Sequence, residues 1–276
     1  MENKIVMDSA GDLQEFDRIP FACAPLKILA GDQEFVDDRN CDIAGMVSYL
    51  RSYKGKASTA CPSVGEYLDA FGDAENVYCI TITSGLSGSY NAAAIAAQTF
   101  LEQYPTRKIH VFDSLSAGAE MALAAEKIRE LVLQGLPFEA VVEQTTTYMK
   151  TTRLMFSLES LHNLANNGRV PPAVAKVAGI LGIRLLGKAS DEGTLQPTGK
   201  ARGEKKVAPE LMRHLTEMGY AGGKMRICHC FNAECASTLR DLILTKFPTA
   251  SVAIATTGAL CSFYAEQGGL MIGFEV

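Results

Sequence analysis

The stretch that decides the fold is residues 77–104, VYCITITSGLSGSYNAAAIAAQTFLEQY. An apolar run, Val77–Thr83, leads into a turn rich in Ser and Gly, and an Ala-rich segment, Ser89–Tyr104, follows. β-Branched and aromatic residues favour a strand, whereas alanine favours a helix. Glycines allow a tight turn, and the first N–H groups of a helix lack partners within it. The stretch therefore predicts a strand–turn–helix unit whose turn can bind an anion such as a carboxylate or phosphate.

Two other expected strands also end in hydroxyl-bearing and acidic residues. The carboxyl ends of parallel strands meet at one edge of a sheet, where ligands bind. The candidates for the anion site are Ser84, Gly85 and Ser87, and those for its edge are Asp8, Ser9, Asp113 and Ser114. Capping of helix N-termini by Ser and Asp is the alternative explanation for each position.

Strands and helices alternate through the first half of the chain, which is typical of a parallel sheet covered on both faces. The expected strands are residues 4–7, 22–29, 77–83 and 108–112, and the expected helices are 42–53, 63–71, 89–104, 117–134 and 138–150. The second half mixes helices (153–165, 172–181, 206–218, 234–247, 260–267) with strands (184–188, 194–200, 225–231, 251–255, 270–275). The sequence predicts an α/β fold with two domains, an N-terminal parallel-sheet α/β domain, 1–153, and a C-terminal α+β domain, 154–276.

Composition excludes several classes of protein. Of the 276 residues, 47% are hydrophobic and 21% are charged, which suits a globular chain and not a disordered one. The net charge of −5 argues against nucleic-acid binding, for which a basic surface is usual. No signal-peptide pattern is present, and polar residues interrupt the longest uncharged stretches. We therefore expect a cytoplasmic protein whose eight cysteines are reduced thiols.

Metal binding and ester hydrolysis are two further alternatives. Cys228-His229-Cys230 lies in an expected strand, whose alternation sends His229 to the face opposite both thiols, and no second pair completes a zinc site. Ser87 resembles the nucleophile of a G-x-S-x-G turn, but Ser89 replaces the second glycine. The four histidines lie within expected helices or strands and not at strand ends. A serine hydrolase is therefore the weaker alternative, and we expect no metal and no catalytic residue.

Seven segments, in order along the chain, resemble motifs of the DegV family of bacterial fatty-acid-binding proteins. They are Asp8-Ser9 with Asp12-Leu13, Thr59–Ser63 with Gly65-Glu66, Ser84–Gly88, Asp113–Gly118, Asn167–Val170, Lys200–Lys206 and Thr257–Leu260. Each motif is weak alone, but the seven in order are specific and run through most of the chain.

The resemblance implies two α/β domains with one long-chain fatty acid between them. Members of the family are acyl-carrying subunits of a fatty-acid kinase, in which a separate ATP-binding subunit phosphorylates the bound carboxylate for phospholipid synthesis. By resemblance, Thr59 and a serine of the 84–87 turn hold the carboxylate, and Arg202 approaches it from the second domain. Arg169, on an exposed turn, is expected to contact the kinase subunit. Such a subunit needs no cofactor, and its membrane contact is at most transient.

One position departs from the family pattern. Members commonly place a His before the C-terminal Thr-Gly turn, whereas this chain reads Ala255-Thr256-Thr257-Gly258-Ala259. Thr256 therefore joins the expected carboxylate site in place of an imidazole. This change leaves open an alternative function, that of a lipid carrier or sensor without a kinase partner.

Overall fold

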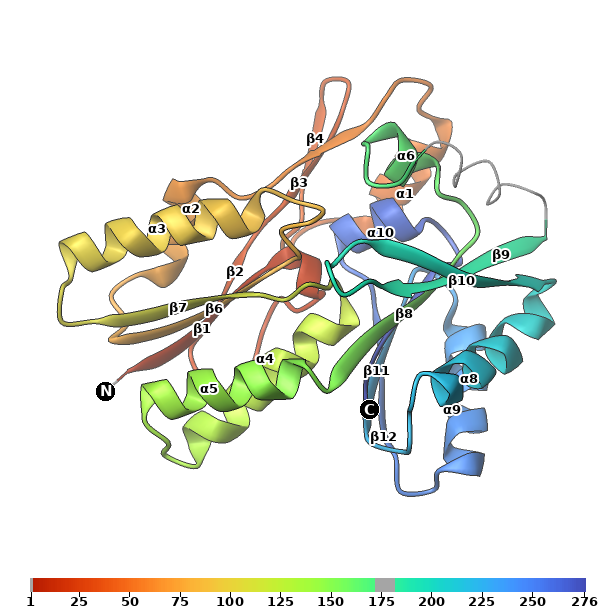
Figure 1. The fold of residues 1–276 in the computed structure, drawn as a ribbon. Helices are drawn as coiled ribbons and strands as arrows, with labels where there is room; N and C mark the ends of the chain where they lie inside the picture. The colour runs from red at the N-terminus through yellow and green to blue at the C-terminus, as the bar shows by residue number, and fades with distance from the viewer. Residues whose placement is uncertain (1, 172–181) are drawn as a thin grey trace.

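The strands of the computed structural model form three sheets within the residues that it describes, 2–171 and 182–276 (Figure 1). A four-stranded and a three-stranded sheet use the first part of the chain, and a six-stranded sheet uses β8 to β13. Two 3₁₀ turns, Ser9–Gly11 and Glu204–Lys206, follow β1 and β10. The predicted α/β fold class is confirmed, while the helix expected over 172–181 lies outside the described residues.

The four-stranded sheet is parallel throughout. Its order is β2-β1-β6-β7, with bounds Phe21–Ala24, Asn3–Asp8, Asn76–Thr81 and Lys108–Asp113. The helices on its two faces are α2 (Val64–Phe71) and α3 (Ser89–Gln103) on one side, and α4 (Ala119–Leu133) and α5 (Phe138–Met149) on the other. In β6, Val77 and Cys79 pack toward α2 and α3, and Tyr78 and Ile80 toward α4. This arrangement explains why the run is continuously apolar.

The strand expected over residues 22–29 is two strands in different sheets. β2 ends before Pro25, and β3 begins two residues after it in a second, antiparallel sheet. Proline has no N–H for a sheet ladder, which favours a break at this point. The second sheet has the order β4-β3-β5, with bounds Gln33–Val36, Lys27–Ala30 and Ser58–Ala60, and α1 (Ile43–Ser52) packs against it.

The six-stranded sheet is mixed, because β11 and β12 are parallel while its other neighbouring strands are antiparallel. Its order is β10-β9-β8-β13-β11-β12, with bounds Leu195–Arg202, Ile183–Ala189, Thr152–Leu158, Leu270–Glu275, Lys224–His229 and Ser251–Thr256. On one face lie α8 (Val207–Glu217) and α9 (Ala233–Lys246). The other face contacts α4, which therefore lies between the two larger sheets (Figure 1).

The prediction of a helix over residues 153–165 is wrong. The chain forms strand β8 up to Leu158 and then a short helix, α6 (His162–Asn166). β8 is hydrogen-bonded on both sides, to β9 and β13, and this pairing outweighs any helical spacing in the sequence. The domain boundary between residues 153 and 154 stays a prediction, and β8, which opens the six-stranded sheet, begins at Thr152.

Helix α10 (Ala259–Ala265) comes late in the chain but packs against α1 and β3, which come early. The N–H of Gly258 donates to Asp12 Oδ1 at 2.7 Å, and the next two N–H groups donate to the carboxylate of Asp37 at 2.7 and 3.0 Å. Two acidic side chains thus supply acceptors that the start of a helix lacks. They join the two parts of the chain beside the cavity described below.

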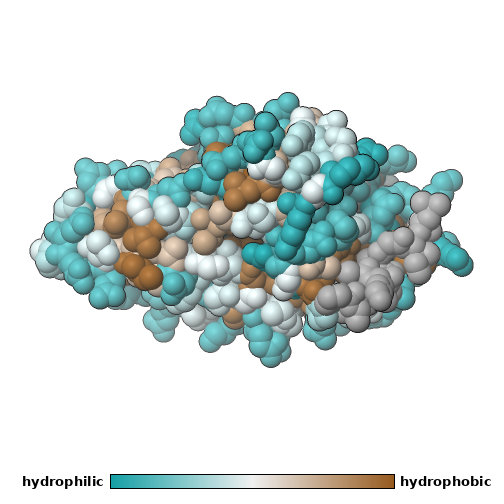
Figure 2. Space-filling view, turned by 90° about the horizontal axis from the view of Figure 1, so that it is seen from above, coloured by the Kyte–Doolittle hydropathy of each residue, from teal (hydrophilic) through white to brown (hydrophobic). Residues whose placement is uncertain are grey.

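The surface shown in Figure 2 is largely hydrophilic, with apolar side chains gathered in separate small patches. No helix in the described part of the chain combines the length and the hydrophobicity that crossing a bilayer requires.

Candidate functional site

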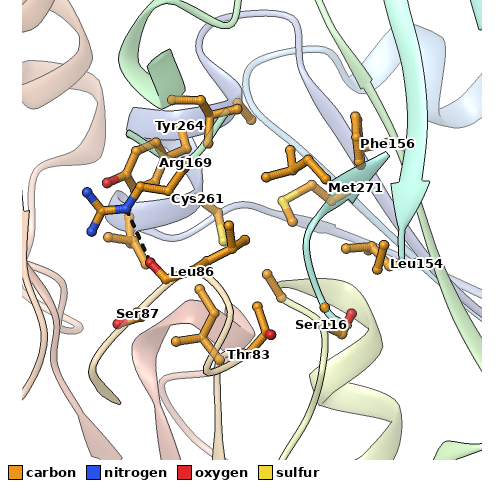
Figure 3. Close-up of a pocket in the computed structure, with 18 of the residues that line it drawn as sticks. Thr83, Leu86, Ser87, Ser116, Leu154, Phe156, Arg169, Cys261, Tyr264 and Met271 are labelled. Carbon is orange, nitrogen blue, oxygen red and sulfur yellow. Dashed lines mark hydrogen bonds between the residues drawn. The ribbon is translucent and has the colours of Figure 1, made fainter. Parts of the chain in front are cut away.

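A largely apolar cavity lies between the carboxyl edge of the four-stranded sheet, one face of the six-stranded sheet and α10 (Figure 3). About 800 Å³ of space free of atoms lies within it, part of which is open to solvent. Both parts of the chain line it: Leu26, Thr59, Ile82, Thr83, Leu86, Ser87, Ser116 and Ala117 from the first, and Leu154, Phe156, Leu158, Leu164, Arg169, Ala189, Gly193, Thr194, Leu195, Leu260, Cys261, Tyr264, Ala265 and Met271 from the second.

One end of the cavity is apolar. Leu154, Phe156 and Leu158 alternate along β8 and therefore share the face that lines the cavity. Met271 of β13 is the cross-strand partner of Phe156 and lies beside it (Figure 3). On the other side of Phe156, β9 carries Gly187, where a Cβ would lie 2.3 Å from the phenyl ring. The missing side chain at this position therefore makes room for the ring.

The opposite end of the cavity carries polar groups (Figure 3). Thr59 Oγ1 and the hydroxyl of Tyr264 are hydrogen-bonded at 2.7 Å, and burial raises the pKa of Tyr264, which keeps its proton. Arg169 Nε donates to the carbonyl of Leu86 at 3.2 Å, and its guanidinium lies 5.9 Å from the ring of Tyr264. Ser87 lines the cavity at this end. These groups can donate hydrogen bonds to an anion.

The turn of residues 84–88 sends one of its candidates into the cavity. Ser87 Oγ accepts from the first N–H of α3 at 3.2 Å. It therefore helps to satisfy the start of the helix, which was the alternative to anion binding. Its own proton is still available to donate to a ligand. Ser84 is exposed, and its N–H donates to a carboxylate at the end of β7. Gly85 lies under the β9–β10 hairpin, where a Cβ would be 2.9 Å from a backbone oxygen. Of these three candidates, Ser87 alone lines the cavity.

The four residues expected at the edge of the site, Asp8, Ser9, Asp113 and Ser114, do not line the cavity but hold the strand ends beside it. Asp8 is fully buried, accepts from a serine hydroxyl of α3 at 2.6 Å and from the N–H of Ile82 at 2.9 Å, and burial raises its pKa to about 7. Asp113 accepts from two backbone N–H groups at 3.1 Å. Ser9 accepts from a backbone N–H at 3.0 Å, and Ser114 donates to a carbonyl at 3.0 Å.

Arg202 and Thr256 lie away from the cavity. Arg202 is exposed at the end of β10 opposite the cavity-lining Leu195, a separation of about 20 Å along an extended strand. Thr256 is exposed at the end of β12, an edge strand of its sheet. The structure therefore gives no support to a carboxylate contact from either residue.

The prediction that no histidine lies at a strand end is wrong for His229, which is the last residue of β11. Its Nδ1 accepts the N–H of Asn232 at 3.3 Å, and burial lowers the pKa of the imidazole. Among the described residues, no histidine lines the cavity with Ser87. The serine hydrolase alternative therefore lacks the base that it requires.

Arg169 lines the cavity, which corrects the expectation of an exposed turn away from the lipid. Its half-buried side chain also donates through Nη1 to the carbonyl of Asn167 at 2.6 Å. The sequence did not predict Tyr264 as a site residue, because a single tyrosine carries no local signal of a binding site. Sequence reasoning missed the lining face of β8 as well, although the alternation of residues 154, 156 and 158 was a usable signal.

The cysteines near His229 belong to the core. Cys228 and Cys230 are buried free thiols, and burial raises the pKa of both, to about 12 for Cys228. Within residues 2–171 and 182–276, no three or more His, Cys, Asp and Glu side chains are grouped so as to hold a metal ion.

Comparison with known proteins identifies the family. Residues 2–275 match the family described as "Uncharacterised protein, DegV family". The chain belongs to the DegV family. It is 43% identical over 277 residues to a DegV domain-containing protein of Streptococcus pneumoniae, and the match covers 99% of each chain.

Solved DegV structures share the whole fold. The DegV family protein of Eubacterium eligens, loaded with heptadecanoic acid, has a TM-score of 0.97 and 42% identity over 99% of both chains. The Fatty Acid Kinase (Fak) B3 protein of Streptococcus pneumoniae, loaded with linoleic acid, has a TM-score of 0.98 and 43% identity over 100% of both chains. The predicted family is thereby confirmed.

Proposed function

We propose that this DegV chain binds a long-chain fatty acid in the cavity and presents its carboxylate to a separate ATP-dependent kinase subunit. The observation that carries the proposal is a largely apolar cavity at one end of which Ser87, Arg169 and Tyr264 lie together (Figure 3). The fatty acids bound by two similar DegV proteins support it. By the same similarity, the acyl phosphate would feed phospholipid synthesis in the cytoplasm, with at most transient membrane contact.

The apolar end would hold the acyl tail. Each buried CH₂ contributes about 0.8 kcal/mol, so a tail with ~14 methylenes gains roughly 11 kcal/mol before the cost of ordering it. Loss of chain flexibility and of free motion offsets much of that gain. A fatty acid is therefore bound firmly yet can still be released.

The polar end would hold the carboxylate. Thr59, Tyr264 and Ser87 offer hydroxyl donors there, and Arg169 adds a cation. The Nε and Nη1 atoms of Arg169 donate to backbone carbonyls, and Nη2 has no acceptor among the described residues. We therefore assign Arg169 to the carboxylate first, and its contact with a kinase subunit stays a prediction.

Presentation to a kinase rests on similarity to the Fak B3 protein, because this chain carries no nucleotide-binding loop of the G-x-x-x-x-G-K-[ST] type. The carrier or sensor without a kinase partner stays the second candidate, since the fatty acid bound by the DegV protein of Eubacterium eligens fits either function. Acyl phosphate formed from loaded protein, a cognate kinase subunit and ATP would decide between the two.

The protein as purified is expected to contain about one equivalent of fatty acid per chain, because the cavity is largely apolar. Organic extraction followed by mass spectrometry measures this directly. Recovery of no fatty acid, together with no uptake of added palmitate or oleate, would contradict the proposed function.

Ser87→Ala and Thr59→Ala are each expected to weaken fatty-acid binding by about 1.5–3 kcal/mol, since each removes a hydrogen bond to a charged group. Calorimetric titration of delipidated protein measures the change. Ser84→Ala is the matched control, because Ser84 belongs to the same turn but does not line the cavity. Equal affinities for all three variants and the parent would move the carboxylate elsewhere.

A further inference from the structure

The apolar end of the cavity is closed by a thin wall. Leu154 of β8 and Ala189 of β9 line the cavity, and both also line a separate groove on the other side of them. The polar groups along that groove include Lys150, Arg153 and Asp191. Leu154 and Ala189, called the wall below, thus contact both the apolar cavity and an open, polar groove.

Leu154 is buried outside the main apolar clusters. It is only 5% exposed, yet it belongs to none of the buried apolar clusters formed by the described residues. Its cross-strand partner on β13 is Gly273, which offers no side chain to pack against it. The close approach of α4 enforces that glycine, because a Cβ would lie 2.5 Å from the N atom of Glu120. The side chain of Leu154 is thus free to contact whatever fills the cavity.

Leu154 also lies at the end of the cavity farthest from the proposed carboxylate site. Figure 3 shows Leu154, Phe156 and Met271 at one end, and Ser87 and Arg169 at the other. A fatty acid with its carboxylate at Ser87 and Arg169 therefore directs its methyl end toward the wall.

We propose that Leu154 and Ala189 determine the length of the acyl chain and exclude tails with a polar ω-end. The inference rests on the proposed function, since it assumes that the tail lies at this end of the cavity. A methyl group makes favourable apolar contact with the wall, whereas a hydroxyl group there loses its water. The hydroxyl of Ser116, which lies beside Leu154 (Figure 3), already donates to Glu120 and has no proton left for the ligand. When the wall is opened, the tail can reach the groove, where water and charged side chains can solvate a polar end.

The test compares hexadecanoic acid with 16-hydroxyhexadecanoic acid, which differ only at the ω-end, on delipidated protein. The parent is expected to bind hexadecanoic acid at least tenfold more tightly. Leu154→Ala is expected to reduce that preference to within about threefold. Leu158→Ala is the matched control, because Leu158 lies on the same face of β8 and lines the cavity but not the groove. It should enlarge the cavity and retain the preference of the parent.

Ala189→Leu provides a second, opposite test at a half-buried position that lines the cavity, where a larger side chain reduces the space for the tail. It thickens the wall, so it is expected to weaken the binding of octadecanoic acid about tenfold relative to the binding of dodecanoic acid. This variant also keeps the proposal testable if Leu154→Ala does not fold. A parent that binds no fatty acid would overturn the proposed function. A parent that binds hexadecanoic acid, with ω-end and length preferences that neither wall variant changes, would overturn this inference alone.

Discussion

Asp37→Ala is expected to lower the free energy of unfolding by about 2–4 kcal/mol, because two buried backbone N–H groups lose their acceptor. The carboxylate of Asp37 accepts from Ala259 and Leu260 at 2.7 and 3.0 Å, and the side chain is 1% exposed. Relief from the cost of burying the carboxylate, which raises the pKa of Asp37, offsets part of the loss. Chemical denaturation measures the difference.

Asp38→Ala is the control for this prediction. Asp38 is the next residue, but its carboxylate accepts only a local N–H, that of Asn40, at 2.8 Å, so its loss should cost less than 1 kcal/mol. Asp37→Ala should also weaken fatty-acid binding, since Leu260 and Tyr264 of α10 line the cavity. Equal stability of the two variants would mean that α10 does not depend on Asp37.

Between pH 4 and pH 7, Asp8 and Asp12 are each expected to lower the stability of the parent by about 1 kcal/mol per pH unit. Burial raises the pKa of Asp8 and of Asp12 from 3.8 to about 7. The folded chain therefore keeps protons that the unfolded chain releases above pH 4. Stability from these groups is complete below pH 4 and is lost as the pH rises through 7.

Asp12→Asn isolates the contribution of one of these groups. Asparagine keeps an acceptor for the N–H of Gly258 but carries no charge, so the variant should lose less stability than the parent from pH 4 to pH 7. Exposed Asp32→Asn is the control and should follow the parent. Denaturation curves at four pH values measure the slopes of parent and variants, and an Asp12→Asn variant with the same slope as the parent would contradict the assignment.

The sequence predicted those elements whose pattern is local. The strand–turn–helix unit of residues 77–104 was found because its apolar run, its glycines and its alanines each favour one conformation. β8 was missed because its pairing with β9 and β13 depends on residues far along the chain. Short strands such as β5 were missed because three residues carry no periodic signal.

The same distinction holds for the site. Thr59 and Ser87 were found because they lie in motifs that can be compared one by one, and both line the cavity. Arg169 was found but given the wrong surroundings, since burial depends on the packing of both parts of the chain. Tyr264 reaches the cavity through α10, whose position depends on carboxylates more than 200 residues earlier, and no local pattern records that.

The capping of α10 has a consequence for the order of events during synthesis. The hydrogen-bond partner of Asp12 lies 246 residues later in the chain, and that of Asp37 lies 222 residues later. Contacts of such sequence separation form late, because the intervening chain must first be made and ordered. A nascent chain on the ribosome therefore has both carboxylates in place long before the helix that closes the cavity exists. A chain interrupted before Gly258 would therefore lack the part of the cavity lining that α10 supplies.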